Sequence, residues 1–302
     1  MWFWLSIIAL LCWSGSDLFS KIGCADPSDR HSHLKMVTAV GIVMGLHAAY
    51  EIFIGKTEIS LEIILTYLPV SLLYIGSMAL GYIALRYIEL SVSSPICNSS
   101  GALVAIMCLI TGGIGQTGTG QLIATAVICI GVVGLGFAEA YEDEEKRAAR
   151  QQKGNYKYSK SALALILPLA YCVLDAAGTF ADSLVLETLN EDSANVAYEL
   201  TFFAAGICTL IYTLIIKREK PVAKRTVPKF IGAVFETAGQ FAYIYAIGDS
   251  EHVMLSAPII SAYCAVSVIW SRIFLKEKMS WKHYLAIGVT IIGIVIMGVF
   301  DI

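Results

Sequence analysis

Apolar runs of about 20 residues recur along the whole chain, and this feature limits the possible folds more than any other. A helix of that length rises about 1.5 Å per residue and spans the roughly 30 Å hydrocarbon layer of a membrane. With 57% hydrophobic and 15% charged residues, the chain has more apolar surface than a water-soluble fold could bury. The period-two alternation of a membrane β-barrel does not occur. The sequence therefore predicts an all-α polytopic membrane protein.

Ten membrane-spanning helices are expected. Their ranges are 2–22, 34–55, 63–88, 91–111, 119–139, 161–181, 195–216, 228–247, 252–274 and 282–300. The charged stretch 141–160 separates the fifth span from the sixth and reads as a cytosolic linker. The expected units are thus a five-helix half over 1–140, the linker over 141–160 and a second five-helix half over 161–302.

Two short strings occur in both halves and indicate an internal repeat. SSPICNSS, which contains Pro95, resembles SAPIISAY, which contains Pro258, and each starts a corresponding span. WSGSD, ending at Asp17, likewise corresponds to YCVLD, ending at Asp175. Because each unit has an odd number of helices, the second copy must enter the membrane upside down. We therefore expect two inverted five-helix repeats, a plan that recurs in secondary transporters.

The paired prolines have two interpretations. Proline breaks the hydrogen-bond ladder of a helix, so Pro95 and Pro258 could serve as symmetry-related gates or hinges. Alternatively, each proline simply begins its helix, where its missing N–H costs nothing. The glycine-bearing fifth and tenth spans, GVVGLG and GVTIIGIVIMG, could pack against each other within one chain or between the protomers of a homodimer. GIVMG, from Gly41 to Gly45, predicts a further close helix contact.

Basic residues predict the orientation. Twenty of the 21 Lys and Arg residues fall on one side of the ten-span arrangement, and only Lys56 falls on the other. The positive-inside rule places the twenty in the cytosol, so both termini would lie outside a cytoplasmic (inner) membrane. The eight cysteines follow no metal or disulfide spacing and are interpreted as packing residues.

The chain resembles the drug/metabolite transporter superfamily, in particular its EamA-type ten-helix members. The resemblance is carried by the stretch from Leu255 to Val299, with Pro258 early in a span, Glu277 in the next loop and a glycine-bearing last span. CWSGSDLFSK resembles the start of the family's first span. TGGIGQTGTGQ in the first half lacks a glutamate that would match Glu277, and the expected orientation is opposite to that of better-known members. The resemblance implies a transporter of small metabolites or drugs.

Acidic residues within the spans are the main candidates for a site, because a carboxylate at mid-membrane costs roughly 3 kcal/mol on insertion scales. Glu236 shares a helix face with Gln240 and Tyr243, and Asp175 shares one with Tyr171. These acids either line a cavity or only bind neighbouring helices.

Further candidates are less clear. Asp17 could line the cavity or pair with Lys21 one turn on. Glu199 could line the outer mouth or lie among lipid headgroups, and Asn98 and Tyr263 could line the cavity or only join helices.

Acids but no lysine or arginine occur at the middle of the spans, which favours an organic cation or zwitterion as cargo over a dianion. The expected function is secondary active transport by alternating access, with proton coupling through Glu236 or Asp175. Lipid flipping is the alternative. An enzyme is not expected, because HExxH and GxSxG motifs do not occur, and a receptor is the remaining reading. We expect no cofactor, metal or nucleic acid; the expected partners are a small-molecule substrate, protons and membrane lipids.

Overall fold

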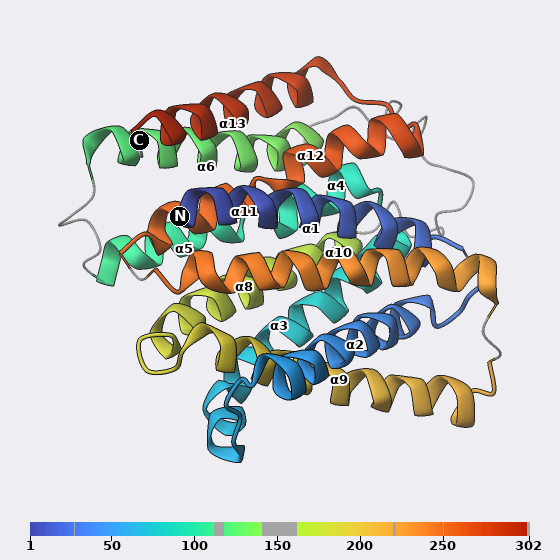
Figure 1. Cartoon of the computed structure of the whole chain (residues 1–302). Helices are drawn as coiled ribbons and strands as arrows, with labels where there is room; N and C mark the ends of the chain where they lie inside the picture. The colour runs from blue at the N-terminus through green and yellow to red at the C-terminus, as the bar shows by residue number, and fades with distance from the viewer. Residues whose placement is uncertain (27, 112–117, 141–161, 220–221, 250, 301–302) are drawn as a thin grey trace.

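The computed structural model describes residues 1–26, 28–111, 118–140, 162–219, 222–249 and 251–300 (Figure 1). The linker predicted at 141–160 lies outside them. In the first half the helices are α1 (Trp2–Cys24), α2 (Ser32–Tyr50), α3 (Leu61–Tyr87), α4 (Leu90–Cys97), α5 (Ser100–Thr111) and α6 (Thr119–Ala140). In the second half they are α8 (Ala162–Val185), α9 (Glu191–Ile211), α10 (Ala223–Ile247), α11 (Val253–Ser261), α12 (Tyr263–Trp270) and α13 (Trp281–Phe300). Single π-helical turns extend three of them: η1 (Glu51–Gly55) after α2, η2 (Tyr212–Ile216) after α9 and η3 (Ser271–Leu275) after α12.

Nine helical segments among the described residues are long and apolar enough to cross a membrane. They coincide with nine of the expected spans, and α8 occupies the place of the sixth. The predicted fold class, an all-α polytopic membrane protein, is therefore confirmed. The number of ten spans stays a prediction.

Polar caps explain why two spans begin earlier than the apolar pattern predicts. The side chain of Ser60 accepts a hydrogen bond from the amide of Ile63 at 3.2 Å, which starts α3. The side-chain oxygen of Asn190 accepts one from the amide of Ser193 at 2.8 Å, which starts α9. Each cap satisfies a backbone donor that the first helical turn leaves free. The helices therefore extend past the apolar run into polar sequence.

The helices pair across the two halves of the chain. Both termini lie at one end of the bundle, here named the terminal end (Figure 1). The opposite end, where α1 ends and α2 begins, is named the linker end. α1 packs along α10 and α8 packs along α3, while α2 packs against α9, α5 against α11 and α6 against α13. Exchange of the two halves converts α1–α10 into α8–α3 and α5–α11 into α12–α4, which is also in contact, and it leaves the α2–α9 and α6–α13 pairings unchanged. Inverted repeats would produce this pattern of contacts.

Glycines set two of these contacts. A Cβ atom on Gly41 of α2 would lie 2.7 Å from the main-chain oxygen of Phe202 and 2.8 Å from the Cα of Gly206, both in α9. The close contact predicted from GIVMG is thus confirmed. In α13, a Cβ on Gly293 would lie 2.7 Å from the side chain of Ile128 in α6. The glycine-bearing fifth and tenth spans therefore pack within one chain.

The two proline-bearing helices are interrupted after their prolines. Pro95 is the sixth residue of α4 and Pro258 the sixth of α11, so the interpretation in which each proline begins its helix is wrong. The helix ends at Cys97 in one case and at Ser261 in the other, and it restarts within a few residues. A proline inside a helix removes one backbone donor and crowds the preceding turn. Both interruptions fall at the level of the pocket described below.

Charged side chains join the helices at the linker end. The buried carboxylate of Asp29, in the α1–α2 connection, lies 2.6 Å from the ammonium of Lys35 and 3.1 Å from that of Lys229 in α10. Arg86 of α3 donates to the main-chain oxygen of Asp29 at 2.6 Å, and Lys35 also pairs with Glu219 at 2.6 Å. Burial raises the pKa of Asp29, but the two lysines outweigh it, so this pKa lies below its usual value.

We predict that Asp29→Asn destabilises the protein at neutral pH by about 3 kcal/mol, because it leaves the buried ammonium of Lys229 without its counter-charge. A lowered folded-state pKa stabilises at pH above the unfolded value of about 3.9, and this contribution is lost as the pH falls through the lowered value. Thermal unfolding followed with a thiol-reactive dye should show the loss at pH 7. Asp26→Asn is the matched control, because Asp26 is 37% exposed and its pair with Arg225 is screened by solvent. Equal melting temperatures for both variants would contradict the prediction.

Candidate functional site: a carboxylate-lined pocket between the two halves

One pocket lies where the two halves meet. Its lining comes from α1, α3, α4, α5, α8, α9, α10, α11 and α12. Measured as the space open to the centre of a water molecule, the cavity is about 70 Å³. The pocket therefore suits a small ligand.

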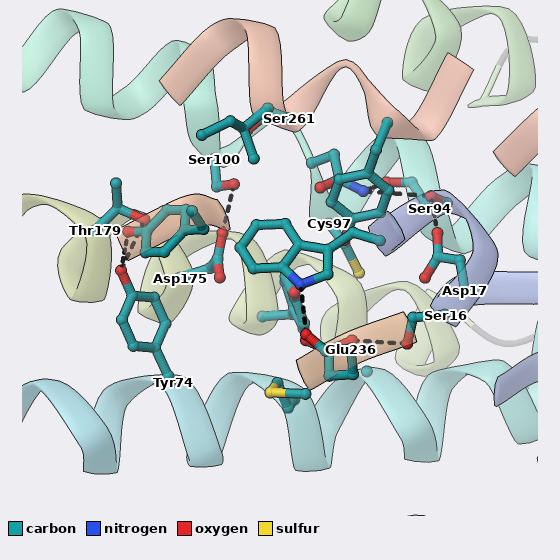
Figure 2. Close-up of a pocket in the computed structure, with 18 of the residues that line it drawn as sticks. Ser16, Asp17, Tyr74, Ser94, Cys97, Ser100, Asp175, Thr179, Glu236 and Ser261 are labelled. Atoms are coloured by element: carbon teal, nitrogen blue, oxygen red, sulfur yellow. Dashed lines mark hydrogen bonds between the residues drawn. The ribbon is translucent and has the colours of Figure 1, made fainter. Parts of the chain in front are cut away.

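Two carboxylates from the second half face hydroxyl groups of the first half (Figure 2). Asp175 of α8 accepts a hydrogen bond from the hydroxyl of Ser100 in α5 at 2.7 Å. Glu236 of α10 accepts one from the hydroxyl of Ser16 in α1 at 2.7 Å. Trp13 donates through its indole N–H to the main-chain oxygen of Glu236 at 3.4 Å. Each acid therefore joins the two halves across the pocket.

The third carboxylate, Asp17 of α1, is bonded to both interrupted helices. It accepts a hydrogen bond from the hydroxyl of Ser94 in α4 at 2.5 Å and one from Ser267 in α12 at 2.8 Å. The ammonium of Lys21 donates to the main-chain oxygens of Leu85 at 2.8 Å and Ile88 at 2.6 Å. Two of its three donors are thus satisfied without Asp17. Asp17 lines the pocket, as one of its two interpretations expects, and its pair with Lys21 stays a prediction.

Aromatic side chains form much of the remaining wall. They are Trp13, Tyr74, Tyr82, Tyr171, Tyr198, Tyr243 and Tyr263. The ring of Trp13 lies 5.1 Å from that of Tyr243 and 5.9 Å from that of Tyr263, measured between centroids. Among the described residues that line the pocket, none is a lysine or an arginine. Three acids amid π-faces form an environment suited to a cation.

Several buried polar atoms of the lining have no hydrogen-bond partner among the described residues. They are the side-chain nitrogen of Gln240 and the hydroxyls of Tyr82 and Ser20. A buried polar group without a partner costs roughly 1–3 kcal/mol, so native structures usually satisfy it with water or a ligand. These groups supply donors that a polar ligand in the pocket could use.

Glu277 fixes the position of α4 from the other half of the chain. Its buried carboxylate accepts hydrogen bonds from the amides of Leu90 at 3.3 Å and Ser91 at 3.1 Å. These amides belong to the first turn of α4, where backbone donors are otherwise free and a negative charge is favoured. Since α4 carries Ser94 and Cys97 into the pocket, the loop before α13 helps to place the lining.

We predict that Glu277→Ala lowers the stability by roughly 1–3 kcal/mol, because two buried amides lose their acceptor. Glu277→Gln retains one acceptor oxygen and should lose less. Thermal unfolding of the purified variants measures the difference. Lys278→Ala, in the same loop, serves as the control. A lower stability of Glu277→Gln than of Glu277→Ala would contradict the capping role.

The structure brings most of the sequence candidates to the pocket. Its lining includes Asp17, Asn98, Tyr171, Asp175, Glu236, Gln240, Tyr243 and Tyr263. The amide nitrogen of Asn98 also donates to the main-chain oxygen of Ser94 at 2.8 Å, across the interruption of the helix. Pro95 and Pro258 themselves lie outside the lining, although residues that flank them belong to it. The binding and gating roles of these residues stay predictions.

Glu199 does not line the pocket, so its expected place at the mouth is wrong. Its fully buried carboxylate lies 2.8 Å from the imidazole of His47 in α2, and Asn195 donates to it at 3.2 Å. The alternative, a place among lipid headgroups, is also wrong, because the side chain is 0% exposed. The close α2–α9 contact explains both results, since it encloses Glu199 between these helices.

Asp182 and the tyrosines of α3 are not among the candidates predicted from the sequence. Asp182 is fully buried and accepts a hydrogen bond from Tyr67 at 2.7 Å and one from Tyr74 at 3.3 Å. The signal was present, because Asp182 lies two turns after Asp175 on the same face of α8. The partners were not predictable, since they come from a helix about a hundred residues earlier.

Comparisons with known proteins agree with the fold. Residues 162–299 match the model of the EamA-like transporter family. One solved crystal structure aligns with 99% of this chain and 98% of its own, at 15% sequence identity and a TM-score of 0.66, which shows a shared fold alone. A comparison with curated proteins gives no match.

The second half, from α8 to α13, is therefore an EamA-like unit in a multi-pass helical membrane protein. The resemblance to the drug/metabolite transporter superfamily is thus confirmed over these residues. Because EamA is a family of transporters, the match supports a membrane transporter of small molecules and agrees with a protein that is not an enzyme.

Proposed function

We propose that the protein is a secondary active transporter that moves a small organic cation or zwitterion through the pocket by alternating access. The observation that carries this proposal is the pocket's lining, with three carboxylates, seven aromatic side chains and, among its described residues, no basic group. A cation that enters gains ion pairs in a site of low dielectric and contacts with aromatic faces. The unpartnered side-chain nitrogen of Gln240 would serve the carboxylate of a zwitterion.

The symmetric helix pairs support the alternating-access mechanism. We propose that residues 1–140 and 161–302 are inverted repeats that rock against each other around the pocket. The interrupted helices after Pro95 and Pro258 lie at equivalent places, so each half supplies one hinge. Motion of α4 or α12 changes the positions of the Ser94 and Ser267 hydroxyls, which donate to Asp17. The hinges are thereby connected to the pocket.

Proton coupling would arise at the same acids. Glu236 or Asp175 holds either a proton or the substrate's ammonium group, because a buried carboxylate is costly without one of them. Return of the empty carrier with a bound proton then exchanges substrate for protons. The excess of basic residues at the linker end supports a place in the cytoplasmic membrane with that end in the cytosol.

The alternative of lipid flipping has less support from the geometry. A flippase needs a lateral opening from the substrate site to the lipid. The apolar groove between α6 and α13, lined by residues such as Phe137 and Leu285, shares no residue with the pocket.

We predict that Glu236→Gln and Asp175→Asn each lower the uptake of a cationic substrate by at least about tenfold, because each removes a charge that faces it in a buried site. Purified protein in proteoliposomes is challenged with quaternary and primary amines, amino acids and neutral metabolites. Glu199→Gln is the matched control, since it also removes a buried carboxylate but one that lies outside the pocket. Uptake of only neutral compounds, or full uptake by both pocket variants, would contradict the proposal.

Tetramethylammonium separates substrate binding from proton coupling, because this cation does not titrate. An imposed pH gradient should drive the accumulation of tetramethylammonium in wild-type vesicles. It should fail to do so with the Glu236→Gln or the Asp175→Asn variant, whichever lacks the coupling acid. Equal transport rates with and without the gradient would exclude proton coupling and leave facilitated transport.

A further inference from the structure

Asp182 is a buried acid with tyrosine partners. One carboxylate oxygen accepts the hydroxyl of Tyr67 at 2.7 Å and the other accepts that of Tyr74 at 3.3 Å. Its side chain is fully buried, and no ion pair of Asp182 occurs within the part of the chain that the structure describes. Such a group is costly inside a membrane, so it requires a reason beyond helix packing.

The network around Asp182 continues to the wall of the pocket. The hydroxyl of Tyr74 bonds to Thr179 of α8 at 3.2 Å (Figure 2). It also bonds to the hydroxyl of Tyr243 in α10. Tyr74, Thr179 and Tyr243 line the pocket, whereas Tyr67 and Asp182 do not. The carboxylate thus holds part of the pocket wall from behind.

The position of the network relative to the ends of the bundle is clear. α8 and α10 run toward the terminal end, and α3 runs away from it (Figure 1). Asp182 follows Asp175, Tyr243 follows Glu236, and Tyr67 precedes Tyr74 along these helices. The network therefore lies on the terminal side of the pocket acids and joins α3, α8 and α10 there.

We propose that Asp182 is a proton site separate from the pocket carboxylates, and that its ionised form closes the pocket at the terminal end. A carboxylate accepts both tyrosine hydroxyls, but a carboxylic acid has one oxygen that donates instead. A proton taken from water on the terminal side therefore leaves Tyr67 or Tyr74 without its acceptor. The chain of bonds through Tyr74 to Tyr243 then rearranges, and the pocket opens on that side.

Other titratable groups around Asp182 do not supply the missing charge. They are Tyr67 and Tyr74 from α3, Tyr243 from α10, Tyr198 from α9 and Asp175 from its own helix. All are tyrosines or acids, so none provides a cation that would hold Asp182 ionised independently of pH. Proton binding at Asp182 is thus free to act as the switch.

A native thiol reports on this closure without any substrate. Cys97 is buried and lines the pocket. A membrane-impermeant methanethiosulfonate reagent is added to vesicles whose terminal side faces the medium, as verified with an N-terminal epitope tag. Modification of Cys97 is then measured by peptide mass spectrometry at pH 5.5 and pH 8 in wild type and in Asp182→Asn.

We expect the reagent to modify Cys97 of the Asp182→Asn variant at least about threefold faster than Cys97 of the wild type at pH 8. At pH 5.5 the two rates should be similar. The amide has one accepting oxygen, and its other terminal atom donates, as in the protonated acid, so the variant resembles the open form at both pH values. A comparison at equal pH cancels the intrinsic pH dependence of thiol reactivity. Equal labelling at pH 8 would overturn the proposal.

Two more variants supply a second test and a control. Tyr67→Phe removes one donor to Asp182 without any change to the pocket lining, and it should also accelerate labelling at pH 8. If Asp182→Asn does not fold, this variant decides the outcome, and unchanged labelling overturns the proposal. Asp192→Asn is the control, because this acid bonds to Tyr245 at the terminal end but is exposed and outside the pocket.

This inference rests on the proposed function for its purpose, since a transporter needs a closure on each side. Its test is separate, because thiol labelling requires neither flux nor a known substrate. Loss of amine uptake in all assays with normal Asp182-dependent labelling would refute the cargo alone. Normal amine uptake with labelling that is independent of Asp182 would refute the closure alone.

Discussion

Buried carboxylates that no cation among the described residues pairs with are the constraint on which the rest of the structure depends. Asp17, Asp175 and Glu236 lie within the bundle, and hydroxyl groups are the hydrogen-bond partners that face them in the pocket. A hydroxyl stabilises the charged form only in part, whereas an ammonium would satisfy it fully. The negative charge that the hydroxyls leave unsatisfied is available to a ligand. A site that already contained a lysine would gain little from a bound cation. The pocket is therefore suited to a positively charged ligand.

The interrupted helices make this arrangement possible. A continuous helix presents backbone groups that are already bonded, and its side chains follow one fixed spacing. At the interruption after Pro95, Ser94 and Ser100 lie on opposite sides and bond to Asp17 of α1 and Asp175 of α8. After the second interruption, Ser267 of α12 also bonds to Asp17. Glu277 holds the start of α4 from the opposite half. The position of α4 and the hydrogen bonds of Asp175 and Glu236 thus depend on contacts between the two halves of the chain.

Sequence reasoning was sufficient for the spans, because length and apolarity in a membrane leave few alternatives. It also brought out Glu236, Asp175 and their aromatic neighbours, since an acid at mid-span is costly wherever it lies. It could not assign partners. Glu199 resembled the pocket acids in sequence but is bonded to His47 of α2, outside the pocket lining. Asp182 was visible on the face of Asp175, yet only the fold shows that Tyr67 and Tyr74 meet it.

The two ends of the bundle are fastened by different chemistry. Ion pairs among Asp29, Lys35, Lys229 and Glu219 join the helices at the linker end, whereas tyrosine hydroxyls around Asp182 join them on the other side of the pocket. Dissolved ions weaken the partly exposed members of the first set but have little access to the second. The protein would thus sense ionic strength from one compartment and acidity from the other, and two solution variables could bias one conformational equilibrium independently.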